Sequence, residues 1–174
     1  MQQETPPFSK CSAPVFRSQG ERLQEAWIEF LQPFTWDLFV TLTFREEPGH
    51  AEVAEKQYRL LVSMVNRELY GRQWAKHGDG ISYVLASEKQ QRGTTHYHAL
   101  WGQTKHSQDD AERRFKWMEA WNEIAGFARI YPIEEEKAVR CYVSKYVIKG
   151  GELTMGGALQ APPLPFMEQM SCCI

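Results

Sequence analysis

The sequence lacks several features that would place it in a specialised class of protein. No apolar run approaches the roughly 18 residues of a membrane-spanning helix. The first residues, MQQETPPFSK, show no basic segment followed by an apolar one, as a secretory signal would. The four cysteines follow neither a CxxC zinc spacing nor the dense pattern of a small disulfide scaffold. We therefore expect a cytoplasmic protein with reduced cysteines and no membrane partner.

The chain also lacks an excess of basic residues. Lysine and arginine number 20 against 22 aspartates and glutamates, for a net charge of -2. Domains that bind nucleic acid usually show a basic balance, so the composition does not indicate one, although it leaves room for a local basic face. No G-x-x-x-x-G-K-[ST] phosphate loop is present, which argues against a nucleotide-driven motor.

What the sequence does contain is typical of a folded globular protein. Hydrophobic residues make up 43% and aromatic residues 13% of the 174 residues, enough for one core. We expect an irregular amino-terminal arm over 1–17, one domain over 18–150, and a disordered tail over 151–174, where Gly, Pro and Met accumulate.

The hydrophobic pattern predicts alternating helices and strands. Helices are expected over 18–32, 51–71, 107–126 and 134–149, and strands over 36–44, 81–88, 96–102 and 127–133. The two middle strands are separated by the turn KQQRGTT and should form a hairpin. Ser107 or Asp109 is the expected N-cap of the third helix. We therefore predict an α+β fold, a ferredoxin-like antiparallel sheet with helices packed on it.

A pair of histidines in the third predicted strand is the first candidate for chemistry. His96 and His98 are two residues apart, so both imidazoles should point to one face of the sheet. Two imidazoles there would be poor core residues, since each needs its own polar partner. Glu88 ends the preceding strand, and the hairpin should bring it across from them. Two imidazoles and a carboxylate would suit Mg²⁺ or Mn²⁺, whereas no nearby cysteine favours zinc.

The stretch CYVSKYVIKG repeats the pattern Tyr-x-x-Lys twice, as Tyr142 with Lys145 and Tyr146 with Lys149. On a helix these four side chains share one face. The simplest interpretation is an amphipathic helix with half-buried tyrosines and lysines reaching into water. The chemical interpretation is a tyrosine nucleophile whose phenolate is favoured by neighbouring ammonium groups that can also hold a phosphate. Together with a divalent cation, this equipment suits transesterification of a phosphodiester.

Basic residues near these motifs are candidates for binding DNA. Lys137, Arg140, Lys145 and Lys149 give the last predicted helix a strip of positive charge without an acidic residue among them. Such a strip could face phosphates despite the acidic total. Arg92, in the hairpin turn, is assigned to DNA binding with them.

Two other groups of residues have a structural and a functional interpretation. Thr41 and Thr43 alternate on the first predicted strand and could face the site, but β-propensity explains threonine there equally well. Trp101, Trp117 and Trp121 could stack on bases, but burial in the core is favoured.

Three stretches occur in the order of the three motifs of a known superfamily. FVTLTF (39–44), GTTHYHALW (93–101) and YVSKYVIK (142–149) resemble the motifs of HUH endonucleases. Over roughly 36–150 the chain resembles the rolling-circle replication initiators, or Rep proteins, of plasmids and single-stranded DNA phages. The resemblance implies Glu88, His96 and His98 as metal ligands. It also implies Tyr142 and Tyr146 as nucleophiles, with Lys145 and Lys149 as their helpers.

The resemblance implies nicking and rejoining of single-stranded DNA at a replication origin through a covalent 5′-phosphotyrosine intermediate. The implied partners are single-stranded or hairpin origin DNA, a separate helicase and a host polymerase. We favour two nucleophiles; if there is only one, YVIKGGE favours Tyr146. The alternatives are an HUH-type transposase and a non-catalytic ferredoxin-like module that binds nucleic acid.

Overall fold

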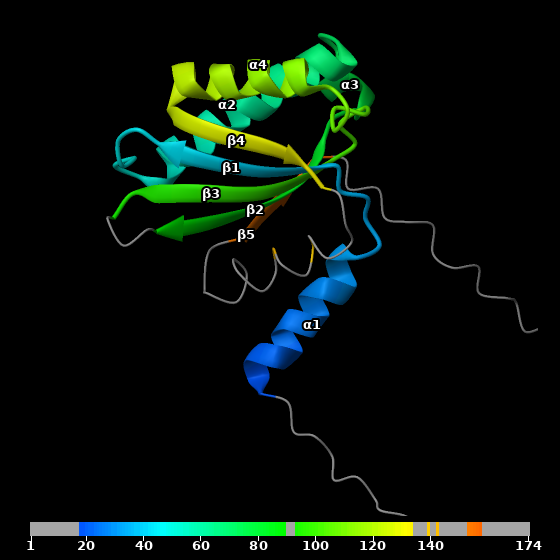
Figure 1. The fold of residues 1–174 in the computed structure, drawn as a ribbon, viewed down its shortest axis with the longest axis vertical. Coiled ribbons are helices and arrows are strands. Elements are labelled where there is room, and N and C mark those ends of the chain that lie inside the picture. The colour runs from blue at the N-terminus through cyan, green and yellow to red at the C-terminus, as the bar shows by residue number, and fades with distance from the viewer. Residues whose placement is uncertain (1–17, 90–92, 134–138, 140–141, 143–152, 158–174) are drawn as a thin grey trace, which may run out of the picture.

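A computed structural model describes residues 18–89, 93–133, 139, 142 and 153–157. Nine helices and strands are found in these residues (Figure 1). They are α1 (Gln19–Leu31), β1 (Leu38–Phe44), α2 (Ala51–Tyr70), α3 (Trp74–His77), β2 (Ser82–Lys89), β3 (Thr95–Gly102), α4 (Ala111–Ile124), β4 (Gly126–Pro132) and β5 (Leu153–Gly156).

The strands form one antiparallel sheet in the order β4-β1-β3-β2-β5. The two central strands, β1 and β3, come from the predicted strands with the strongest β-branched and aromatic character. Along β1, fully buried and partly buried residues alternate strictly, because successive side chains point to opposite faces. The sheet therefore presents two faces with different residues.

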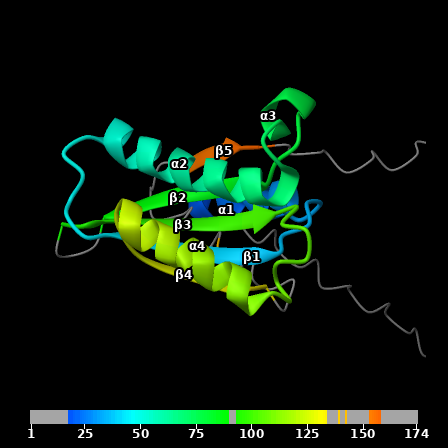
Figure 2. The same ribbon diagram turned by 90° about the horizontal axis from the view of Figure 1, so that it is seen from above.

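One face, which we call the α2/α4 face, carries the main hydrophobic core. Helices α2 and α4 lie side by side across it (Figure 1, Figure 2). The strand residues in this core are Leu38, Val40, Leu42, Phe44, Leu85, Tyr97, Ala99, Trp101, Ala128 and Ile130. The apolar stripe of α2, including Tyr58, Leu61 and Val65, packs on them.

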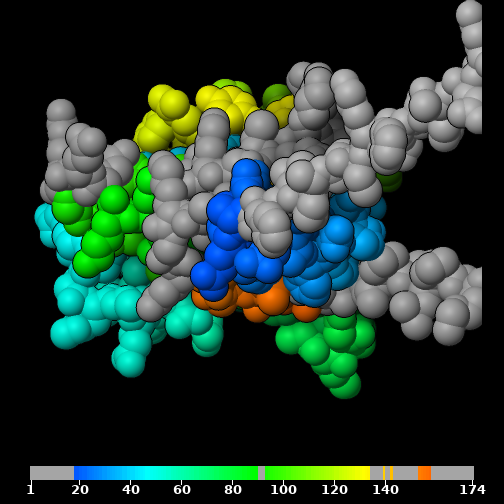
Figure 3. Space-filling view, turned by 90° about the horizontal axis from the view of Figure 1, so that it is seen from below, coloured from blue at the N-terminus to red at the C-terminus, as the bar shows by residue number. Residues whose placement is uncertain are grey.

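The opposite face, which we call the α1 face, carries a smaller apolar cluster. Helix α1 begins at a capping box between Ser18 and Glu21 and lies against this face near β5 (Figure 3). Its buried residues Ile28 and Leu31 join a cluster whose other buried members are Trp36, Val84, Ala86, Leu100 and Tyr142.

These observations confirm the predicted α+β class, with helices packed on an antiparallel sheet. The eight segments predicted as helices or strands correspond to described elements, except the helix over 134–149. Of that helix only Val139 and Tyr142 lie within the described residues, and both are helical. The predicted arm over 1–17 lies outside the described residues.

Two boundaries differ from the sequence prediction. Helix α4 begins at Ala111 rather than 107, because the side chain of Asp110 caps it by accepting a hydrogen bond from the Arg113 backbone at 2.9 Å. The short helix α3 was not predicted.

Strand β5 lies inside the segment predicted as a disordered tail and corrects that part of the prediction. It pairs with β2, and Leu153 packs against the α1-face cluster. Its glycine is required for packing, since a Cβ at Gly156 would lie 2.4 Å from the Tyr83 hydroxyl oxygen. A glycine that reads as flexibility in the sequence thus permits a close approach in the sheet.

None of the helices in the described part of the chain is both long and apolar enough to span a membrane.

Candidate active site on the α1 face

The strand register gathers the polar residues of the α1 face into two neighbouring rows. One row runs from Phe127 on β4 through Thr43 and His96 to Glu88 on β2. The next row contains Arg129, Thr41, His98 and Ala86, in the same strand order. Residues directly opposite each other in antiparallel strands project from the same face, so each row is a line of neighbouring side chains. The predicted pairing of Glu88 with the histidines across the hairpin is confirmed.

Each histidine is held by a threonine of β1. The Thr43 hydroxyl oxygen lies 3.1 Å from His96 Nδ1, and the Thr41 hydroxyl oxygen lies 3.2 Å from His98 Nδ1. Both rings are nearly buried, with 9% and 8% of the residue exposed. When Nδ1–H donates to the threonine oxygen, the lone pair for a metal is on Nε2. The two threonines therefore have a role beyond β-propensity, which the sequence left undecided.

The carboxylate of Glu88 lies beside the histidine pair. Its Oε2 atom is 3.5 Å from Nε2 of His98, and the two imidazole rings stack at a centroid distance of 6.4 Å. Burial lowers the pKa of His96 below its ordinary value, and the Glu88 charge partly opposes that shift. The net effect favours the neutral imidazole, which is the form that can bind a metal.

The three predicted ligands provide a suitable donor set but not a closed metal cage. Two nitrogens and a carboxylate on one face match what a divalent cation with open positions requires. As the side chains lie, however, no group of three His, Cys, Asp or Glu among the described residues is arranged to hold a metal. The near-parallel rings, 22° apart, would have to converge by side-chain rotation.

Tyr142 packs directly against the sheet below this site. It is 1% exposed, and its hydroxyl is within donating distance of two carbonyl oxygens, 3.2 Å from that of Val84 and 3.1 Å from that of His98. The ring of Phe39 meets the Tyr142 ring edge-on and stacks near His98. The first tyrosine of the repeated motif is therefore anchored in the apolar cluster, while the last predicted helix meets the face that carries the histidines.

The other predicted site residues lie outside the described part of the chain. They are Arg92, Lys137, Arg140, Lys145, Tyr146 and Lys149. The tryptophans can be placed: Trp101, Trp117 and Trp121 are all buried on the α2/α4 face, which confirms the core interpretation over base stacking.

An antiparallel sheet with paired histidines on its central strand, a carboxylate on the next strand and a tyrosine-bearing helix on the same face is the arrangement of an HUH-type Rep protein. The model of the family described as replication-associated protein ORF2 matches residues 37–151, and the chain belongs to this family of phage and plasmid replication initiators. Its role is thus in the initiation of phage or plasmid replication. Neither the curated proteins nor the solved structures contain a match to the chain.

Proposed function

We propose that this protein nicks and rejoins single-stranded DNA at a replication origin, through a covalent link between a tyrosine and the 5′ phosphate. The observation that carries the proposal is the register of β1, β3 and β2. It sets Glu88, His96 and His98 together on the face against which Tyr142 packs. The family match supports a replication initiator over a transposase.

The residues that would hold a divalent cation, Mg²⁺ or Mn²⁺, are His96, His98 and Glu88. Such an ion would polarise a phosphoryl oxygen and stabilise the negative charge that develops on it during the reaction. Thr41 and Thr43 would act as positioning residues, because their contacts with Nδ1 select the tautomer with Nε2 available to the ion.

We assign the attack to Tyr146 first and treat Tyr142 as the second candidate. The Tyr142 hydroxyl would have to leave two backbone carbonyls and a nearly fully buried position before it could reach a phosphodiester. This burial favours the single-nucleophile alternative over two nucleophiles. Tyr146 is one helical turn further along the predicted helix, on the same helix face.

In the proposed step, the tyrosine oxygen forms a bond to phosphorus and the bond from phosphorus to the 3′ oxygen breaks. The phenol loses its proton to solvent, and the departing 3′ oxygen takes one up to become a hydroxyl. Lys145 and Lys149 would favour the phenolate and hold the phosphate. Attack by a 3′ hydroxyl on the phosphotyrosine reverses the step and rejoins the strand.

The proposed DNA partner is a single-stranded or hairpin origin, contacted by Lys137, Arg140 and Arg92 as well as by the site. The sequence contains no phosphate loop, so we propose that a separate helicase unwinds the duplex and a host polymerase extends the 3′ end.

We also propose that the segment from β1 to β4 is a ferredoxin-like core. The chain order β1-α2-β2-β3-α4-β4 and the sheet order β4-β1-β3-β2 support this assignment, with β5 as an added edge strand. The proposed domain, first bounded at 150, then extends through β5 to Gly156.

Covalent capture tests the proposed activity. The purified chain is incubated with Mn²⁺ and a pool of labelled single-stranded oligonucleotides tiling the replicon that carries its gene, then run on a denaturing gel. We expect a shifted protein–DNA band that EDTA prevents. The band should disappear in His96→Ala and Tyr146→Phe and persist in Tyr142→Phe.

Each departure from that pattern has a defined meaning. If only the double variant Tyr142→Phe/Tyr146→Phe loses the band, both tyrosines are nucleophiles. If His96→Ala is folded by circular dichroism and still forms the band, the metal assignment is wrong. If the wild type forms no band with the complete pool, the nuclease proposal is wrong and a binding module remains.

A further inference from the structure

We propose that the outward side of β4 is a stacking platform for unpaired DNA bases, placed directly beside the candidate active site. The platform consists of Phe127, Arg129 and Tyr131. It rests on the proposed function, because it assigns a subsite to the single-stranded DNA that the active site would cleave.

The platform is conspicuous because its aromatic rings are exposed where the rest of the strand is buried. Phe127 is 57% and Tyr131 is 55% exposed, and Arg129 between them is exposed as well. The alternate residues Ala128 and Ile130 point to the α2/α4 face and are buried in the core. Scattered exposed apolar residues need no explanation, but two aromatic rings aligned on one side of one strand are unusual on a soluble surface.

Arg129 gives the platform a positive charge between its two rings. Its guanidinium carbon lies 5.5 Å from the centroid of the Phe127 ring, within the range of a cation–π contact. In the described part of the chain, no carboxylate forms an ion pair with Arg129. A guanidinium without a carboxylate partner is suited to a phosphate, and the rings beside it are suited to bases.

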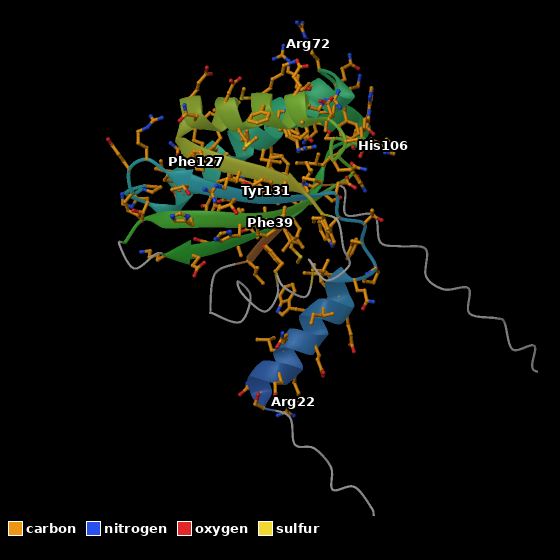
Figure 4. All side chains as sticks on the ribbon, in the orientation of Figure 1. Arg22, Phe39, Arg72, His106, Phe127 and Tyr131 are labelled. Atoms are coloured by element: carbon orange, nitrogen blue, oxygen red, sulfur yellow. The ribbon has the colours of Figure 1, made fainter. Side chains whose placement is uncertain are left out.

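The platform is continuous with the predicted metal ligands through the sheet register. Phe127 lies opposite Thr43 and Arg129 opposite Thr41, while Thr43 and Thr41 lie opposite His96 and His98. The platform is therefore two strands away from the histidines, or about 10 Å at the usual strand spacing. A DNA strand lying across the sheet could contact both places with adjacent nucleotides. Figure 4 shows Phe127 and Tyr131 on the sheet, on the opposite side from Arg72.

The spacing of the platform suits an extended single strand rather than a duplex. Phe127 and Tyr131 are four residues apart on one strand, which places their Cα atoms about 13 Å apart. That distance leaves room for two splayed bases, one on each ring, with the intervening phosphate near Arg129. Bases in a duplex are stacked on each other and cannot lie on protein rings, so the platform would select unpaired DNA.

A binding assay in the absence of metal tests the platform separately from catalysis. The full chain in EDTA is titrated against fluorescein-labelled oligodeoxythymidylate of 20 nucleotides, and against a duplex of equal length, with anisotropy as the readout. Phe127→Thr and Tyr131→Thr should each weaken binding of the single strand about 5- to 150-fold, since a stacked base contributes about 1–3 kcal/mol. Tyr131→Phe keeps the ring and should bind like the wild type.

Matched controls lie on the opposite side of the molecule. Phe115 on α4 is 63% exposed, and Arg72 is exposed beyond the end of α2. Phe115→Ala and Arg72→Gln should leave affinity for the single strand unchanged, whereas Arg129→Gln should weaken it and flatten its salt dependence. Photocrosslinking with 5-iododeoxyuridine should attach the strand to Phe127 or Tyr131, as located by mass spectrometry.

The outcomes separate the platform from the proposed nuclease activity. If the wild type forms the covalent band but the β4 variants bind the single strand normally, the platform is wrong and the nuclease proposal stands. If no covalent band forms but binding still depends on Phe127 and Tyr131, the platform stands without catalysis. If Phe127→Thr and Tyr131→Thr instead convert a dimer to a monomer in sedimentation with unchanged DNA affinity, the surface joins two copies and the platform is wrong.

Discussion

The two faces of the sheet are made by the same strands but differ in almost every property. On the α2/α4 face, β1 and β3 contribute buried residues to one large core; these are Leu38, Val40, Leu42, Phe44, Tyr97, Ala99 and Trp101. On the α1 face, the intervening positions hold Thr41, Thr43, His96 and His98, and only part of this face is apolar. Stability and chemistry are therefore separated by alternation within a strand rather than by distance along the chain.

This separation explains how the molecule keeps polar groups in the middle of a sheet. Burying an imidazole is unfavourable unless its nitrogens find partners. The Thr41 and Thr43 hydroxyls supply those partners from the adjacent strand. The large core on the other face offsets the remaining cost, so the site can be arranged for ligand binding rather than for packing.

The largest contrast should appear between neighbouring residues of β1. Leu42→Ala should lower the free energy of unfolding by about 2–5 kcal/mol, because Leu42 is fully buried and would leave a cavity. Thr43→Ala, one residue away on the other face, should cost about 0.5–1.5 kcal/mol through the lost contact with His96. Urea unfolding followed by circular dichroism measures both values. Equal losses would contradict the division of roles between the faces.

The next contrast concerns the threonines as positioning residues. Thr41→Val and Thr43→Val keep the shape but remove the hydroxyl, and each should weaken Mn²⁺ binding about 10- to 100-fold. Serine at either position restores the oxygen and should restore the affinity. Isothermal titration calorimetry gives the affinities. Nitrogen chemical shifts of the metal-free histidines should report the Nδ1–H tautomer only when the hydroxyl is present, and an unchanged tautomer in the valine variants would contradict the assignment.

A third prediction uses the tyrosines of the α2/α4 face. Burial raises the pKa of Tyr58 well above its ordinary value near 10, while its contact with Trp101 opposes the shift. Because the folded-state pKa is the higher one, this contribution to stability is complete below pH 10 and is lost as the pH rises above it. The free energy of unfolding should then fall by about 1.4 kcal/mol per pH unit for this group.

Tyr58→Phe serves as the test of that prediction. It should remove one proton from the alkaline slope while adding a constant cost, because Trp101 Nε1 loses its hydrogen-bond acceptor. Unfolding in urea at several pH values between 9 and about 11.5 gives the slopes. An identical slope in the wild type and in Tyr58→Phe would show that Tyr58 does not resist ionisation in the folded state.

The smallest effect is expected at Tyr142. Tyr142→Phe preserves the ring between Phe39 and the cluster but removes the hydroxyl next to the Val84 and His98 carbonyls. The expected loss is about 0.5–1.5 kcal/mol in the free energy of unfolding. Chemical denaturation gives this value. A variant as stable as the wild type but unable to form the covalent adduct would reverse the interpretation and make Tyr142 a nucleophile.

The sequence predicted the elements whose hydrophobic period is strong. Strand β1 and helix α2 agree with the prediction to within two residues at each end, because alternation and the 3.6-residue period are long and uninterrupted there. The pairing of Glu88 with His96 was also predictable, since a hairpin connects them in sequence. The aromatic burial of Trp101, Trp117 and Trp121 follows from composition alone.

Other features depend on contacts that leave no local pattern. The pairing of Thr41 with His98 joins residues 57 positions apart and requires the register between β1 and β3. Strand β5 is only four residues long and ends in glycine, so its pairing with β2 gives no periodic signal. The exposure of Phe127 and Tyr131 follows from the edge position of β4 in the sheet order, which the sequence does not specify.

The pairing of β2 with β3 also limits how a gene for such a protein can change in length. Deleting one residue between Tyr97 and Trp101 would reverse the facing of every residue on one side of the deletion, exchanging imidazoles for core aromatics. A two-residue deletion would keep the faces but move Glu88 out of line with His96. Insertions and deletions should therefore be tolerated between the paired strands and purged within them. Relatives that acquire new origins would do so by substitution on the ladder and by growth at its ends.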